Sequence, residues 1–221
     1  MRTRLKVCCI SSIEEAALAV RCGADALGLV GEMPSGPGVI EDGLIAEIAR
    51  HAPAGVATFL LTSRTDPDGV VSQVRATGVT TVQLVDEVSA GTYAALRRHA
   101  PGVKIVQVLH VQDEDVLEQA RRIENEVDAI LLDSGRPGAP VKELGGTGRT
   151  HDWNLSTRLV AATQRPVFLA GGIRSSNVAD AIHTVRPFGI DLCSGVRTDG
   201  RLDEIKLREL AGAMRRADMG D

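Results

Sequence analysis

The sequence predicts a (β/α)8 barrel, the TIM-barrel fold of the α/β class, formed by a single domain over residues 1–221. Short apolar runs alternate with helical patterns along the whole chain, which indicates successive βαβ units and a parallel sheet. Eight such units fit into the chain at roughly 27 residues each, which is short but sufficient for a closed barrel. A doubly wound open sheet shares this alternation and is the main rival fold.

The expected elements follow from periodicity and capping residues. Ser12 is expected to cap the first helix, with Glu15 three residues later as in a capping box. Further helices are expected to begin at Asp113 and at Ser175 or Ser176. The expected strands are Leu5–Ile10, Ala26–Val30, Gly55–Leu61, Thr81–Leu84, Lys104–His110, Ala129–Asp133, Val167–Ala170 and Gly189–Cys193.

Composition excludes several classes of partner. The formal net charge is −4, the basic residues are scattered and aromatic residues make up 2% of the chain, so no nucleic-acid surface is expected. No apolar run approaches the roughly 20 residues of a membrane span or the length of a signal peptide. The protein is therefore expected to be cytoplasmic, as a monomer or homodimer. Its 4 cysteines show no C-x-x-C spacing and are expected to be free thiols.

Candidate proton-transfer groups stand where strands end, which is where barrel enzymes carry their chemistry. Cys8 and Asp133 end the first and sixth expected strands. Side chains alternate along a strand, so Lys6 shares the face of Cys8 and places a cation one layer below the thiol. Only one of Cys8 and Cys9 can face the active centre from a regular strand, and we expect Cys8. The structural alternatives are that Cys8 is a small packing residue and that Asp133 caps the following loop.

A small anionic ligand needs a local binding site, and glycines are expected to supply one; glycines that serve only the turns are the structural alternative. Gly171 and Gly172 follow the seventh strand, and Ser194 and Gly195 follow the eighth, the two positions where barrels of this class commonly bind phosphate. The long loop after the sixth strand holds a mobile lid or a hairpin tip at Gly146, Thr147 and Gly148. A metal site from Cys8, Cys193 and a histidine is not expected, because no ligand pair has short spacing.

These residues together resemble the phosphoribosylanthranilate isomerase family of tryptophan biosynthesis. The similar segments are K-V-C at 6–8, L-L-D-S at 131–134, G-G-T-G at 145–148, L-A-G-G-I at 169–173 and S-G-V at 194–196. The resemblance implies an Amadori rearrangement of an N-(5-phosphoribosyl) amine to the 1-amino-1-deoxyribulose 5-phosphate, with Cys8 as general base and Asp133 as general acid. It implies no metal and no organic cofactor. Lys6, Gln83 and Asp191 are the expected substrate-binding residues.

Three departures from the family pattern concern the site. Cys9 replaces the glycine that follows the family's cysteine, and Q-L-V-D at 83–86 replaces its Q-L-H-G. S-G-P-G at 35–38 replaces its S-P-R, whose arginine pairs with the anthranilate carboxylate, and no Lys or Arg occurs between Arg21 and Arg50. His151 or Arg197 is the expected substitute for that arginine. The alternatives to the family reaction are the same chemistry on a different amine, a non-catalytic phosphosugar-binding barrel and another phosphosugar isomerase or epimerase.

Overall fold

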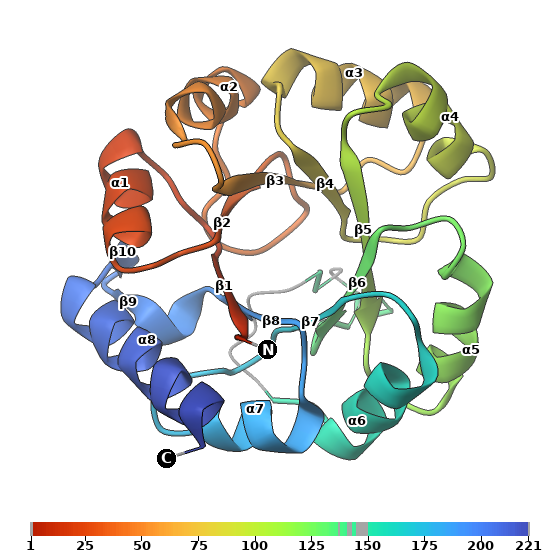
Figure 1. Cartoon of the computed structure of the whole chain (residues 1–221). Helices are drawn as coiled ribbons and strands as arrows, with labels where there is room; N and C mark the ends of the chain where they lie inside the picture. Colours follow the sequence, from red (N-terminus) through yellow and green to blue (C-terminus); the bar gives the residue numbers. More distant parts are fainter. Residues whose placement is uncertain (1, 137, 141–142, 145–149, 221) are drawn as a thin grey trace.

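The chain forms a closed eight-stranded parallel barrel with helices around its outside (Figure 1). The computed structural model describes residues 2–136, 138–140, 143–144 and 150–220. Strand β1 pairs with β2 on one side and with β8 on the other, which excludes the open sheet. The strands are β1 Arg4–Val7, β2 Ala26–Val30, β3 Ala57–Thr62, β4 Thr81–Leu84, β5 Lys104–His110, β6 Ala129–Asp133, β7 Val167–Leu169 and β8 Gly189–Leu192.

The helices follow the strands in the expected alternation, so the prediction of the barrel is confirmed. A short hairpin of β9 (Arg197–Thr198) and β10 (Arg201–Leu202) precedes the last helix, after the 3-10 turn η1 at Ser194–Val196. The helices are α1 Ile13–Arg21, α2 Asp42–His51, α3 Pro67–Thr77, α4 Thr92–His99, α5 Asp115–Ile123, α6 Trp153–Ala162, α7 Val178–Val185 and α8 Glu204–Met219.

Two apolar clusters account for the packing. The larger lies between strands and helices and includes Val7, Leu27, Leu60 and Ile130. The smaller fills the barrel interior with residues such as Cys8, Phe59, Val106, Leu131 and Phe168. The rings of Phe59 and Phe168 meet edge to face at a centroid distance of 5.8 Å, which closes the interior below the strand ends.

Several expected boundaries are wrong by a few residues. Strand β1 ends at Val7 and not at Ile10, because Cys9 has a φ of 61° that no strand residue adopts. Helix α7 begins at Val178 and not at Ser175 or Ser176, with Asn177 as its N-cap, and α5 begins two residues after Asp113. The Ser12 cap is confirmed, since its hydroxyl accepts the Glu15 N–H.

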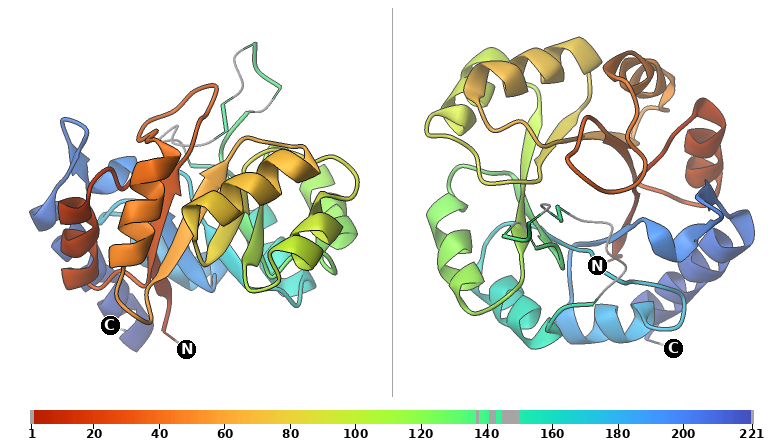
Figure 2. Two further views of the ribbon diagram at one scale, coloured as in Figure 1. Left: turned by 90° about the horizontal axis from the view of Figure 1, so that it is seen from above. Right: turned by 180° about the vertical axis from the view of Figure 1, so that it is seen from behind.

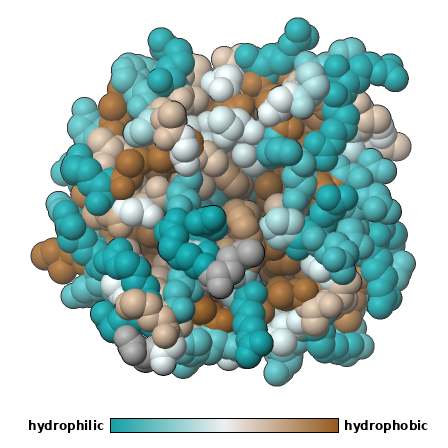
Figure 3. Space-filling view, viewed as in Figure 1, coloured by the Kyte–Doolittle hydropathy of each residue, from teal (hydrophilic) through white to brown (hydrophobic). Residues whose placement is uncertain are grey.

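The two ends of the barrel differ. In the side view of Figure 2, the loop after β2 rises above one end, and both termini lie at the opposite end. Figure 3 shows one face with hydrophilic residues spread round its rim and apolar residues in small groups between them. None of the helices within the described ranges is long and apolar enough to cross a membrane.

Candidate active site

A cavity of about 770 Å³, counted with its open mouth, lies at the carboxyl ends of the strands. Its wall includes residues from β2, β3, β4, β5, β6 and β8, from the turn that follows β1 and from other loops at the same end of the barrel. The structure brings together eight of the residues that the sequence singled out, and these are Cys8, Gln83, Asp133, Gly171, Gly172, Asp191, Ser194 and Gly195. The lid candidates Gly146, Thr147 and Gly148 lie outside the described residues.

Both thiols of the β1 turn line the cavity, so the expectation that only one could do so is wrong. Strand alternation ends at Val7, and the left-handed conformation of Cys9 turns its side chain back toward the same space. This conformation costs a non-glycine residue about 1–2 kcal/mol, which explains why glycine suits the position. Gly38 lies against the turn, and a Cβ on Gly38 would stand 2.5 Å from the Cys9 Cβ.

The Cys9 thiol is the weaker candidate for a base. Its hydrogen bonds to the sulfurs of Cys193 and Cys8, together with burial, raise the pKa of Cys9 well above its usual range. The same contact with Cys9 lowers the pKa of Cys193, and the Arg197 guanidinium lowers it further. A thiol that keeps its proton cannot accept another. Cys8 therefore remains the candidate base of the β1 turn.

Lys6 and Asp191 form a buried ion pair beneath Cys8. Lys6 Nζ lies 2.8 Å from Asp191 Oδ2, and the Lys6 side chain is 0% exposed. Burial raises the pKa of Asp191, whereas for Lys6 the charges of Asp191 and Cys8 outweigh desolvation and raise its pKa. Lys6 is absent from the cavity wall, so the prediction that it touches substrate is revised to a role through Asp191 and Cys8.

Gly28 of β2 makes room for this arrangement, and sequence reasoning did not assign it a role. A Cβ on Gly28 would stand 2.9 Å from the Cys8 Sγ and 3.1 Å from the Lys6 Nζ. The Cys8 thiol and the Lys6 ammonium therefore both lie beside Gly28 of the neighbouring strand, where a residue with a Cβ would not fit. A glycine flanked by apolar residues in an expected strand is a signal of such close approach.

Asp133 is 5% exposed and ends β6. Burial raises the pKa of its carboxyl, although the charge of His110 and the N–H groups of Ser134 and Gly135 act in the opposite direction. The His110 Nε2 lies 3.0 Å from the Val85 carbonyl oxygen, which fixes the imidazole beside the carboxyl. A carboxyl with a raised pKa keeps its proton nearer to neutral pH, as a general acid requires.

Three buried oxygen atoms of the cavity-lining side chains have no hydrogen-bond partner among the described residues. They are Gln83 Oε1, Asp133 Oδ2 and Asp191 Oδ1. An unpaired buried acceptor costs free energy unless a ligand or water supplies a donor. A polyhydroxylated ligand would supply such donors, so these atoms favour a sugar in the cavity.

The two glycine-containing turns form one side of the cavity. Gly171 and Gly172 have φ values of 87° and 62°, which glycine adopts without strain. Asn177, which sequence reasoning gave no role of its own, braces this turn by donating to the Gly172 carbonyl and accepting the Arg174 N–H. The N–H groups of such turns and of a helix start can surround an anion.

The turn after β8 packs directly on the turn after β7. A Cβ on Gly195 would stand 2.1 Å from the Ile173 carbonyl oxygen, so only glycine fits. Ser194 begins the 3-10 turn η1, and Ser194 and Gly195 line the cavity. The close packing holds the two turns as one unit.

The side of the cavity nearest the loop after β2 is apolar except for Ser35. Met33, Gly36, Pro37, Leu61 and Leu144 line it, and the described residues of the wall include no Lys or Arg. Both expected substitutes for the missing arginine are wrong. Burial lowers the pKa of His151 to about 4, so the ring is neutral, and its Nε2 lies 2.7 Å from the Ser156 Oγ. Arg197 is occupied by Glu15 and by backbone carbonyls.

Within the part of the chain that the structure describes, no group of three metal-ligating side chains is placed to hold a metal ion. The fold and the position of the cavity define a (β/α)8-barrel protein with its ligand site at the carboxyl ends of the strands.

Comparison with known proteins narrows this class. Residues 5–213 match the family model of N-(5'-phosphoribosyl)anthranilate (PRA) isomerase. The chain belongs to this family, whose members are aldose–ketose isomerases of tryptophan biosynthesis.

Individual relatives agree over nearly the full length. The chain is 37% identical over 206 residues to N-(5'-phosphoribosyl)anthranilate isomerase 2 of Methanosarcina mazei, covering 92% of this chain and 90% of that protein. It is similar to the phosphoribosyl anthranilate isomerase structure from Thermus thermophilus, with a TM-score of 0.82, 27% identity and coverage of 96% and 98%. A further isomerase structure, solved in complex with reduced 1-(o-carboxyphenylamino)-1-deoxyribulose 5-phosphate, has a TM-score of 0.78 at 26% identity, with coverage of 96% and 98%.

Proposed function

We propose that this member of the family isomerises N-(5'-phosphoribosyl)anthranilate, with Cys8 as the general base and Asp133 as the general acid. One observation carries the assignment of residues: Cys8, directly after β1, and Asp133, the last residue of β6, line the same cavity. General acid–base catalysis of a sugar isomerisation needs a donor and an acceptor at different sides of the sugar. The anthranilate part of the proposal is supported by the family and by its relatives.

The reaction then follows from these positions. Asp133 gives its proton to the ribose ring oxygen, and the ring opens to a Schiff base between C1 and the amine nitrogen. The Cys8 thiolate takes the proton from C2, which leaves an enolamine. Protonation at C1 and loss of the proton from the C2 hydroxyl give the ketone, so the reaction is an internal redox change with no external oxidant. The Lys6 ammonium stabilises negative charge at the thiol from below.

The remaining contacts position the substrate. The turns at Gly171–Gly172 and Ser194–Gly195 hold the phosphate through backbone N–H groups. The unpaired oxygens of Gln83 and Asp191 accept hydrogen bonds from sugar hydroxyls. A cytoplasmic location and a monomeric or homodimeric state are part of the same proposal.

One observation favours a second candidate substrate. Among the described residues, the side of the cavity formed by the loop after β2 is apolar except for Ser35 and carries no Lys or Arg. An arginine–carboxylate pair at this place would contribute about 1.5–3 kcal/mol, roughly tenfold to a hundredfold in affinity. The same rearrangement on a phosphoribosyl amine without an aryl carboxylate fits that wall.

A fluorescence assay with phosphoribosylanthranilate tests the proposal, using the wild type, Cys8→Ala and Asp133→Ala. Turnover by the wild type and its loss in both folded variants are the expected results. A wild type that binds but does not convert this substrate, and that fails to restore growth of a tryptophan auxotroph lacking the enzyme, would exclude anthranilate as the amine. Full activity in either variant would contradict the residue assignment.

A further inference from the structure

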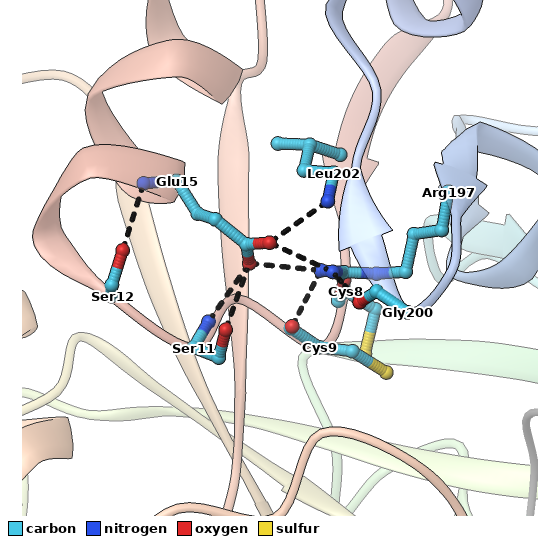
Figure 4. Close-up of polar contacts among 8 residues, drawn as sticks. All are labelled: Cys8, Cys9, Ser11, Ser12, Glu15, Arg197, Gly200 and Leu202. Carbon is cyan, nitrogen blue, oxygen red and sulfur yellow. Dashed lines mark hydrogen bonds and ion pairs between the residues drawn. The ribbon is translucent and has the colours of Figure 1, made fainter.

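A shielded ion pair connects the β9–β10 hairpin to the turn that carries the two cysteines. Arg197 of β9 and Glu15 of α1 pair through Nη1 and Oε1 at 3.0 Å, with side chains that are 8% and 15% exposed. Figure 4 shows the guanidinium between the Glu15 carboxylate and the backbone of Cys8 and Cys9. The pair joins the hairpin between β8 and α8 to the first turn of α1.

Glu15 is held in place by several donors besides Arg197. Its carboxylate accepts the Leu202 N–H at 2.8 Å and both the N–H and the hydroxyl of Ser11 at 3.1 Å. Although burial would raise it, the pKa of Glu15 is lowered by Arg197 and these backbone donors. A fixed carboxylate orients the guanidinium, because the planar group can meet two oxygens at once.

One nitrogen of Arg197 reaches two successive peptide groups. Its Nη2 donates to the Cys8 carbonyl oxygen at 3.2 Å and also to the Cys9 carbonyl oxygen. Nη1 donates to the Gly200 carbonyl oxygen at 2.9 Å, within the hairpin. The carbonyls of Cys8 and Cys9 belong to the two peptide planes on either side of the Cys9 Cα. A single donor that holds both planes fixes the φ and ψ angles of Cys9.

The φ and ψ angles of Cys9 need support from contacts with other residues. Cys9 has a φ of 61°, a conformation that side chains other than glycine rarely adopt. On the other side, the Cys8 N–H donates to the Leu192 carbonyl oxygen of β8 at 2.7 Å. The backbone of Cys8 is therefore held by β8 at its N–H and by Arg197 at its carbonyl. The direction of the Cys8 side chain follows from these two attachments.

We propose that Arg197 and Glu15 are positioning residues that aim the Cys8 thiol at the substrate by holding the Cys9 turn in its left-handed conformation. The proposal rests on the proposed role of Cys8 as the base. It gives Arg197 a function that requires no contact with the ligand, in agreement with its absence from the cavity wall. It also explains how this chain keeps a cysteine where a glycine suits the backbone.

The test compares Glu15→Gln/Arg197→Met with the wild type, because removing both charges avoids leaving one of them buried alone. We expect kcat to fall about 10- to 100-fold, the range that a small misplacement of a reacting group produces, with KM changed less than about threefold. Hydrogen exchange should rise at the amides of Cys8, Cys9 and Ile10. Arg197→Lys should recover part of the rate, since an ammonium can meet one carbonyl.

Repeating the double substitution in a Cys9→Gly variant shows whether the loss of kcat arises from a change in the Cys9 turn. Cys9→Gly adopts the left-handed conformation without help, so the loss of kcat caused by Glu15→Gln/Arg197→Met should shrink to less than about threefold in that background. An equal loss in both backgrounds would overturn the proposal. So would an unchanged kcat in a variant that only melts at a lower temperature.

The matched control is Glu204→Gln/Arg208→Met, which removes an exposed ion pair between two residues of α8. It should leave kcat and the exchange at Cys8 unchanged. If the wild type does not convert phosphoribosylanthranilate, the proposed function fails, but hydrogen exchange still tests whether Arg197 and Glu15 hold the Cys9 turn. Raised exchange confined to residues Cys8–Ile10 in the double variant then supports the positioning role of Arg197 and Glu15, and unaltered exchange overturns it.

Discussion

Lys6 Nζ lies 2.8 Å from Asp191 Oδ2 across the strand pair that closes the barrel. The register places the two residues directly opposite each other, Lys6 on β1 and Asp191 on β8. Both side chains are shielded from water, and Lys6 Nζ also lies 5.2 Å from the centre of the Phe59 ring. A buried pair of this kind contributes little net stability, because desolvation offsets the attraction. Its location directly below Cys8 and the cavity indicates a functional reason for its presence.

Removing one member of this pair should be costly. We expect Lys6→Met to lower the free energy of unfolding by about 3–5 kcal/mol, because it leaves the Asp191 charge buried without a partner. Urea denaturation measures the change. Lys104→Met, which removes an exposed partner of Asp128, should cost less than about 1 kcal/mol. Lys6→Met/Asp191→Leu should recover most of the stability but not the activity, and similar costs for Lys6→Met and Lys104→Met would contradict the buried-pair account.

Asp133→Asn should stabilise the protein at neutral pH while abolishing turnover. Burial raises the pKa of Asp133 in the folded state above its value of about 3.9 in the unfolded chain. The associated stability is therefore fully present below about pH 3.9 and is lost as the pH rises through the folded-state pKa. Asparagine does not titrate, so it removes this dependence of stability on pH. The free energy of unfolding of Asp133→Asn should therefore exceed that of the wild type by an amount that grows from pH 4 to pH 7.

Asp128→Asn is the opposite-sign control for this experiment. Burial would raise the pKa of Asp128, but the Ile105 N–H, Arg97 and Lys104 together lower it. Its replacement should therefore destabilise the protein at neutral pH. A destabilised Asp133→Asn at pH 7 would show that the Asp133 carboxylate is well compensated in the folded state and unsuited to act as an acid.

Gly195→Ala should separate the two turns at the cavity. The added methyl group would stand 2.1 Å from the Ile173 carbonyl oxygen, and neither atom can move without shifting backbone. We expect KM to rise about tenfold or more, the equivalent of one lost charge-assisted hydrogen bond to phosphate. Inhibition by inorganic phosphate should weaken in parallel. Gly102→Ala, which meets nothing within 4 Å, is the control, and an unchanged KM in Gly195→Ala would remove the turns from the phosphate site.

His151 should make the protein sensitive to acid. Burial lowers the pKa of His151 from 6.5 to about 4, so its stabilising contribution is fully present above pH 6.5 and is lost as the pH falls toward 4. At 1.36 kcal/mol per pKa unit the loss amounts to about 3 kcal/mol. His151→Gln should reduce the drop in melting temperature between pH 7 and pH 4, whereas His51→Gln on the exposed face of α2 should not. Equal drops in both variants would contradict this assignment.

Much of the fold was predictable because each apolar run and each helix obeys its own period. The errors occur where tertiary contacts override local signals. Ser175 and Ser176 are good cap residues, yet the helix begins after Asn177, whose side chain bonds to Gly172 and Arg174. The end of β1 was placed too late because nothing local shows that Cys9 leaves the strand.

The site was predictable in part for the same reason. Cys8, Asp133 and the two glycine turns end strands, and a closed barrel brings strand ends together. The partner of Arg197 was not predictable, because Glu15 is 182 residues away along the chain and meets it only through the β1–β8 closure. The loss of the family arginine was visible in the sequence, but the engagement of both expected substitutes elsewhere required the structure.

The most direct measurement is a crystal structure of this protein with reduced 1-(o-carboxyphenylamino)-1-deoxyribulose 5-phosphate. We expect the Cys8 Sγ within about 4 Å of C2 of the sugar chain. On the opposite side of the sugar, we expect an Asp133 oxygen at about 3 Å, hydrogen-bonding distance, from the oxygen that was the ring oxygen. A complex in which either side chain points away from the sugar, or in which Cys9 occupies the place assigned to Cys8, would contradict this expectation.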